Sequence, residues 1–298
     1  MDFESSSLEI EVFRGTQAAS VEFGLVLDAK GLPYERLESA GVWVLRVAPS
    51  LADSATEELR RYASERVERR EPPAPFILYA GSGAGAAVYA MVLILIAYCA
   101  GINLFDADWL AAGALDSRGV AAGEWWRPVT ALTLHLDQEH LLGNLLFGAG
   151  IGILAGRMFG PGVAWLSIVL AGAAANSIDM LVSPPWYRAA GASTAVFAAL
   201  GLLAGFGWGQ PLTLRERRLY RWAPLFGGVC LLALLGAGGE HVDVLGHLLG
   251  FVAGVGFGWA FARGSVPRGH GPWLQPTMGS LALLLVGAAW FVALHHVR

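Results

Sequence analysis

Four polar residues stand out because they lie within otherwise apolar segments: His140, Asn144, Ser193 and His247. Polar and ionisable side chains are costly inside a lipid bilayer, so each one in a membrane-spanning segment is a candidate for function. A serine hydroxyl beside a histidine base, with hydrogen-bond donors close by, is the arrangement that performs acyl transfer. These residue types therefore indicate nucleophilic chemistry at a serine.

The spacing of the first three residues indicates a site at the start of helices. His140 and Asn144 are four residues apart, so they lie on one face of a helix. Ser193 stands in the segment Gly191-Ala192-Ser193-Thr194, at the start of a predicted helix. Backbone N–H groups in a first helical turn lack intrahelical partners and can bind an anion.

The residues that follow His247 predict how this histidine reaches the serine. His247 precedes Gly250, Gly254 and Gly258, which form a stripe of small residues along one helix face. Such stripes let a second helix approach closely within a membrane. If that second helix is the one that begins near Ser193, the imidazole of His247 lies beside the serine hydroxyl.

Seven apolar runs of helical length position these residues, each near the ~20 residues that a bilayer helix needs. They predict spans at about 84–104, 138–158, 162–183, 192–208, 222–238, 244–262 and 277–296. The stretch 105–137 is expected to be a long interfacial loop, because it combines three tryptophans with scattered charges. Ten arginines fall on one predicted side and four on the other, which predicts a cytoplasmic N-terminus and an external C-terminus.

The first quarter of the chain is a different kind of sequence. Residues 1–75 hold 23 of the 44 charged residues, and their patterns predict the order β-α-β-β-α of a small α+β domain. The fold class is therefore an all-α polytopic membrane bundle of six helices plus one, with a small soluble α+β domain at the N-terminus. The predicted parts are a cytoplasmic domain (1–71), a Pro-rich linker (72–83), a six-helix core (84–263) and a further C-terminal helix (277–298).

Composition excludes several other classes of protein. With 55% hydrophobic and only 15% charged residues, the chain is not one soluble globule. A net charge of −4 without a basic patch argues against nucleic-acid binding. Cys99 and Cys230 lie in apolar runs without CxxC spacing, so we expect neither a disulfide nor a thiolate metal site. HExxH is absent, which excludes a zinc protease of that type, and the first residues lack the pattern of a signal peptide.

Several short motifs, in this order, resemble the rhomboid family of intramembrane serine proteases over residues 84–263. They are Glu124-Trp125-Trp126-Arg127, the spacing His135…His140…Asn144, Gly191-Ala192-Ser193-Thr194, and Gly246-His247-Leu248-Leu249-Gly250. A core of six spans with one added at the C-terminus is also an arrangement known in that family. Each motif alone would be weak, but all of them in order on the expected spans make the resemblance specific.

The resemblance implies a function and a set of site residues. It implies a catalytic dyad of Ser193 and His247, with the side chains of His140 and Asn144 stabilising the oxyanion, and neither a metal nor another cofactor. The residues expected to support the site are His135, Trp126, Arg127, Gly191, Phe197 and Gly250. The implied substrates are single-span or polytopic membrane proteins in the lipid bilayer of the cytoplasmic membrane. The N-terminal domain is assigned no partner.

Two residues depart from the family pattern, and two other classes of function stay open. Thr194 stands where glycine is frequent, and Phe197 stands where many relatives have a tyrosine that packs on the histidine. We expect both departures to tune the rate. Asp243, four residues before His247, is positioned as a third member that orients the imidazole, but the resemblance implies a dyad, which argues against this role. The alternatives are a rhomboid-like pseudoprotease that binds membrane clients, and a small transporter whose polar residues line a path.

Overall fold

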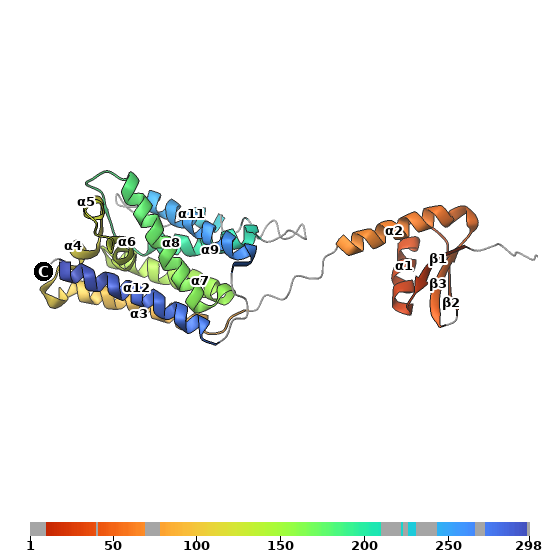
Figure 1. The fold of residues 1–298 in the computed structure, drawn as a ribbon, viewed down its shortest axis with the longest axis horizontal. Coiled ribbons are helices and arrows are strands. Elements are labelled where there is room, and N and C mark those ends of the chain that lie inside the picture. The colour runs from red at the N-terminus through yellow and green to blue at the C-terminus, as the bar shows by residue number, and fades with distance from the viewer. Residues whose placement is uncertain are drawn as a thin grey trace, which may run out of the picture. The chain divides into compact units, whose positions relative to one another are not determined.

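The computed structural model describes residues 10–39, 41–68, 78–209, 222, 226–230, 243–265 and 272–296. The chain forms two compact units, residues 1–75 and 76–298 (Figure 1). Most of the predicted span 222–238 and half of the linker 72–83, residues 72–77, lie outside the described residues.

The N-terminal unit is a three-stranded antiparallel sheet with two helices. Its elements are β1 (Ile10–Gly15), α1 (Gln17–Ala29), β2 (Glu35–Ser39), β3 (Val42–Val47) and α2 (Ala52–Glu68), and the strand order is β1-β3-β2. Leu45 and Val47 of β3 pack against Leu27 of α1 and Leu59 of α2, because alternate residues of the strand face the helices. The predicted β-α-β-β-α order is confirmed.

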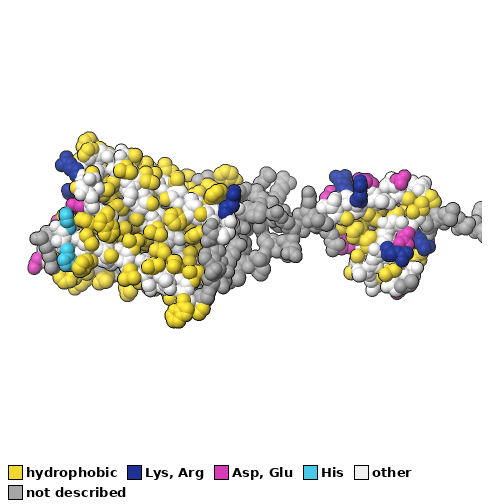
Figure 2. All heavy atoms as spheres, in the orientation of Figure 1, with side chains coloured by type: hydrophobic (Ala, Val, Ile, Leu, Met, Phe, Trp, Pro, Cys, Tyr) yellow, Lys and Arg dark blue, Asp and Glu magenta, His cyan; other side chains and the backbone are white. Residues whose placement is uncertain are grey.

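The second unit is a helical bundle. Its long helices are α3 (Ser82–Gly101), α7 (Gln138–Phe159), α8 (Pro161–Val182), α9 (Ser193–Gly209), α11 (Val244–Ala260) and α12 (Leu274–His296). Within the described ranges, five of them are long and apolar enough to cross a membrane, and α9 is a shorter apolar helix. Hydrophobic side chains cover most of the visible face of this unit in Figure 2. The prediction of a polytopic membrane bundle is confirmed.

Local signals set where these helices begin and end. The carboxylate of Asp137 accepts the backbone N–H of His140 at 2.7 Å and caps the start of α7. Between α7 and α8 the chain turns at Gly160, whose φ of 86° favours a residue without a side chain. Pro161 then begins α8, where its missing N–H is not needed.

Helices α9 and α11 pack backbone against backbone through glycines on both sides. A Cβ on Gly254 or Gly258 of α11 would collide with the backbone of α9, and a Cβ on Gly201 or Gly205 of α9 would collide with the backbone of α11. Only glycine permits this approach, which brings the first turn of α11 against the first turn of α9.

Candidate active site

Ser193 and His247 are in direct contact. Ser193 is the first residue of α9, His247 lies in the first turn of α11, and the distance from His247 Nε2 to Ser193 Oγ is 2.7 Å. Both side chains are buried, with 7% and 4% of their surfaces exposed. Phe197, one turn after Ser193, stacks on the imidazole with a centroid distance of 4.7 Å and an interplanar angle of 17°. The serine hydroxyl therefore has a nitrogen base in hydrogen-bonding range, in a buried position.

The closest contact between α9 and α11 adjoins this pair. A Cβ on Gly250 would meet the backbone carbonyl of Thr194, so a glycine at this position lets His247 approach Ser193. The start of α11 is fixed by Asp243, whose Oδ1 accepts the N–H of Gly246 at 2.7 Å. Asp243 acts as the helix cap, and among the described residues the Nδ1 of His247 has no hydrogen-bond partner. This geometry does not support Asp243 as a third member that orients the imidazole.

His140 borders the same small space as the serine hydroxyl. A Cβ placed on Gly191 would lie 2.8 Å from His140 Nε2 and 3.4 Å from Ser193 Oγ. The absence of a side chain at Gly191 therefore leaves room between the imidazole and the hydroxyl. The backbone N–H of Ser193, as the first in α9, has no acceptor within the helix.

Asn144 lies one turn below His140 on α7 and is 1% exposed. Its backbone carbonyl accepts the hydroxyl of Tyr89 at 2.8 Å. Its side-chain oxygen and nitrogen have no partner within the part of the chain that the structure describes. A buried NH2 group without an acceptor is costly, and an anionic ligand would accept its hydrogen bonds.

His135 supports the loop that leads into α9. Its Nε2 accepts the backbone N–H of Ala192 at 3.5 Å, and its ring meets that of His140 edge to face at 5.2 Å. Burial, with a smaller contribution from His140, lowers the pKa of His135 to about 4. The imidazole is therefore neutral near pH 7, as a nitrogen that accepts a backbone hydrogen bond must be.

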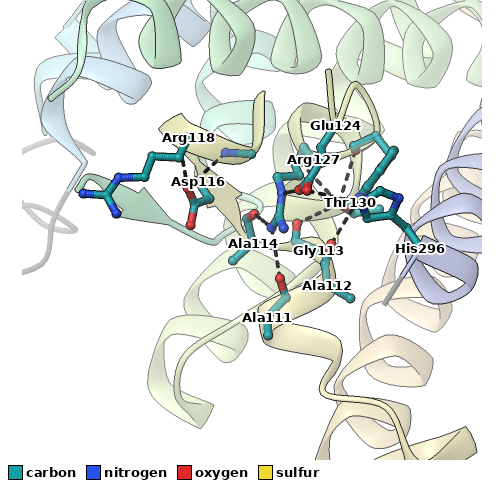
Figure 3. Close-up of polar contacts among 12 residues, drawn as sticks. Ala111, Ala112, Gly113, Ala114, Asp116, Arg118, Glu124, Arg127, Thr130 and His296 are labelled. Atoms are coloured by element: carbon teal, nitrogen blue, oxygen red, sulfur yellow. Dashed lines mark hydrogen bonds and ion pairs between the residues drawn. The ribbon is translucent and has the colours of Figure 1, made fainter. Parts of the chain in front are cut away.

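Trp126 and Arg127 organise the loop at 105–137, and Figure 3 shows the contacts of Arg127. The Arg127 guanidinium donates to the carbonyls of Ala111 and Ala114 at 3.0 and 2.7 Å and pairs with Glu124. Trp126 Nε1 donates to the carbonyl of Ala112 at 3.2 Å. These contacts are within the loop, so both residues hold its shape.

The loop contains three short helices, and α12 packs against it. The helices are α4 (Trp109–Gly113), α5 (Ser117–Ala121) and α6 (Arg127–Thr130), and none is long enough to span a membrane. At the far end of α12, the His296 imidazole lies 3.5 Å from the Glu124 carboxylate (Figure 3). Trp290 of α12 donates to the Thr133 hydroxyl at 2.9 Å. The added C-terminal helix thus contacts and stabilises the loop that precedes α7.

Sequence reasoning missed the glycines of α9. Gly201, Gly205 and Gly209 repeat every four residues, as do Gly250, Gly254 and Gly258 of α11, and this repeat was a usable signal.

Over the described ranges, no group of three histidine, cysteine, aspartate or glutamate side chains is arranged to hold a metal ion.

The fold and the site define a polytopic membrane protein that holds a serine against a histidine between two tightly packed helices. Residues 122–264 match the family model described as Rhomboid domain. The chain therefore carries a rhomboid domain over these residues. This range includes α7, α8, α9 and α11 and hence both members of the pair.

Similar curated proteins carry corresponding names. "Rhomboid protease GluP" of Bacillus subtilis (strain 168) is 34% identical over 148 residues, which are 49% of this chain and 28% of that protein. "Rhomboid-like protease 3" of Toxoplasma gondii is 35% identical over 149 residues, 48% of this chain and 54% of that protein. "Rhomboid-like protein 11, chloroplastic" of Arabidopsis thaliana is 30% identical over 149 residues, 47% of this chain and 53% of that protein. The chain thus spans about half or less of the length of these relatives.

Proposed function

We propose that this protein is an intramembrane serine endopeptidase that cuts other membrane proteins in or beside their transmembrane helices. The observation that carries the proposal is the 2.7 Å contact between His247 Nε2 and Ser193 Oγ inside a membrane bundle. Similarity to proteins named rhomboid proteases supports it. We further propose a location in the cell membrane, with the N-terminus cytoplasmic and the C-terminus external, and the domain boundaries 1–71, 72–83, 84–263 and 277–298.

The geometry supports a mechanism that uses side chains, one backbone N–H group and water. His247 Nε2 accepts the proton of the Ser193 hydroxyl as Oγ attacks the carbonyl carbon of the substrate peptide. The negative charge that develops on the carbonyl oxygen is stabilised by the Ser193 N–H and by the side chains of His140 and Asn144. The intermediate collapses, the C–N bond breaks, and His247 transfers its proton to the leaving amine. Water, activated by His247, then hydrolyses the ester and restores the serine.

Labelling with a fluorophosphonate tests the proposal directly. We expect the detergent-solubilised protein to form one covalent adduct at Ser193, because the reagent reacts with a serine that a neighbouring base activates. Ser193→Ala should abolish the adduct. Ser177→Ala is the matched control, because among the described residues the Ser177 hydroxyl donates to the carbonyl of Ala173 on its own helix at 2.8 Å. Adduct mass and position are read by mass spectrometry.

The same experiment separates the alternatives. A folded wild-type protein that forms no adduct would contradict the protease proposal and favour a pseudoprotease that binds membrane clients. Solute flux into proteoliposomes without any adduct would favour a transporter. The presence of both Ser193 and His247 in contact argues against each of them.

Gly191→Ala tests the space between His140 and Ser193. A methyl group there would overlap the His140 ring and displace it from the position expected for the oxyanion. We expect the cleavage rate to fall by on the order of 10²–10³, as it does when an oxyanion donor is removed. Gly207→Ala on α9 is the control, because a Cβ there meets no atom within 4 Å. A Gly191→Ala variant as fast as wild type would exclude His140 as a donor.

A further inference from the structure

A narrow apolar slot lies between α3, α8 and α12, apart from the Ser193–His247 pair. It encloses about 420 Å³, within the range of about 300–1,000 Å³ typical of ligand pockets. Its walls are formed by one face of each helix, represented by Gly85 and Val88, Trp165 and Ile168, and Gly279 and Ala282. Helices α3 and α12 run along the same part of the bundle in Figure 1. A slot between spanning helices faces the acyl chains of the bilayer.

The length of the slot suits one extended hydrocarbon chain. Along α3 its lining runs from Gly81 to Leu93, a rise of about 18 Å at 1.5 Å per residue. A stretch of this length along the helix accommodates an extended hydrocarbon chain.

One polar atom in this apolar lining has no partner. Trp165 Nε1 is buried and makes no hydrogen bond within the described residues. It faces Gly85, since a Cβ on that glycine would lie 2.7 Å from it. The Trp165 ring stacks on Tyr89 at 4.7 Å, but the Tyr89 hydroxyl is already bonded to the carbonyl of Asn144. A buried indole N–H normally has an acceptor.

The depth of Trp165 suggests which acceptor it meets. It is four residues from Pro161 at the start of α8, about 6 Å along the helix axis. The 22 residues of α8 span about 33 Å, close to the ~30 Å hydrocarbon core. Trp165 thus lies near the boundary between acyl chains and headgroups, the region of the ester carbonyls of phospholipids.

We propose that the slot binds one acyl chain of a membrane phospholipid, whose ester carbonyl accepts the hydrogen bond of Trp165 Nε1. The chain runs from Trp165 past Ile168 toward Thr133 and Ala195, which line the other part of the slot. Ala195 is two residues after Ser193, so the bound lipid supports the base of α9 while it fills the space between α3 and α12. This binding does not depend on protease activity.

Native mass spectrometry of the full-length protein, titrated with a diester phosphatidylethanolamine, tests the proposal. We expect one tightly bound phospholipid on the wild type. Gly279→Leu fills the slot and should reduce occupancy at least tenfold. Gly287→Leu on the same helix is the matched control and should keep the lipid, because a Cβ there meets no atom within 4 Å.

The ester contact is tested separately, by comparing the diester lipid with its diether analogue. The wild type should bind the diester about three- to tenfold more tightly, the effect of one hydrogen bond. Trp165→Phe keeps an aromatic ring but lacks the N–H, so it should bind both lipids equally. The wild-type comparison needs no variant to fold. Equal binding of both lipids by the wild type, retention of the lipid by folded Gly279→Leu, or recovery of only detergent or free fatty acid would overturn the proposal.

Discussion

Replacement of Ser193 or His247 by alanine should abolish cleavage of a transmembrane reporter substrate, and the double variant should be no slower than either single one. The two side chains act jointly across one 2.7 Å contact, so the loss of either removes the whole unit. We expect a fall in the catalytic constant on the order of 10⁴–10⁶, the range seen when members of a serine–histidine unit are removed. Cleavage is measured in proteoliposomes from the product band.

Two control variants make the same substitutions, serine to alanine and histidine to alanine, at positions away from the pair. Ser177→Ala removes a serine that donates to the carbonyl of Ala173, and His295→Ala removes a histidine that contacts the carbonyl of Phe291 on α12. Both should cleave at the wild-type rate. Near-normal turnover by Ser193→Ala would contradict the proposed nucleophile, and effects of Ser193→Ala and His247→Ala that simply add would contradict a joint unit.

Gly254→Ala should lower both the stability of the protein and the rate of cleavage, whereas Gly256→Ala should change neither. A Cβ on Gly254 would overlap the backbone carbonyl of Ala198, and backbone cannot move aside as the end of a side chain can. A Cβ on Gly256, two residues away on α11, meets no atom within 4 Å. We expect Gly254→Ala to destabilise the protein by about 1–3 kcal/mol, as overpacking does. The rate should fall by on the order of 10², the effect of a 1 Å displacement of reacting groups.

Thermal unfolding in detergent and reporter cleavage measure the two effects. Fluorophosphonate labelling adds a third readout, because it reports whether His247 still lies beside Ser193. If Gly254→Ala and Gly256→Ala behaved alike, the close contact of α9 with α11 would not be what brings the two residues together.

Much of the fold was predictable because it depends on local signals. The apolar runs at 84–104, 138–158 and 162–183 correspond to α3, α7 and α8 within three residues at each end. A bilayer requires about 20 apolar residues in each helix, and such a run is visible without any tertiary information. Likewise, the four-residue spacing of His140 and Asn144 placed them on one helix face before their surroundings were known.

The role of Asp243 could not be predicted from its spacing alone. Its position four residues before His247 raised the alternative of a carboxylate that orients the imidazole, against which the implied dyad argued. In the structure the carboxylate accepts the N–H of Gly246 as a helix cap. Both interpretations satisfy the same spacing. Only the coordinates distinguish them, because the difference is a rotation of one side chain toward the backbone.

The sequence by itself predicted the long described helices of the bundle, a set of residues that could do chemistry, and a polytopic membrane protein with a polar N-terminal part. Those properties follow from apolar periodicity, helix geometry and the cost of polar groups in lipid.

Contacts between distant segments were decided only by the tertiary structure. Gln275 of α12 donates to the carbonyl of Phe159 and accepts the N–H of Val163, which ties the added helix to the turn between α7 and α8. Ser193 and His247 are 54 residues apart, and their contact depends on glycines of both α9 and α11. Which helix faces pack together depends on complementary shapes across the bundle, and no local pattern in one segment specifies its partner.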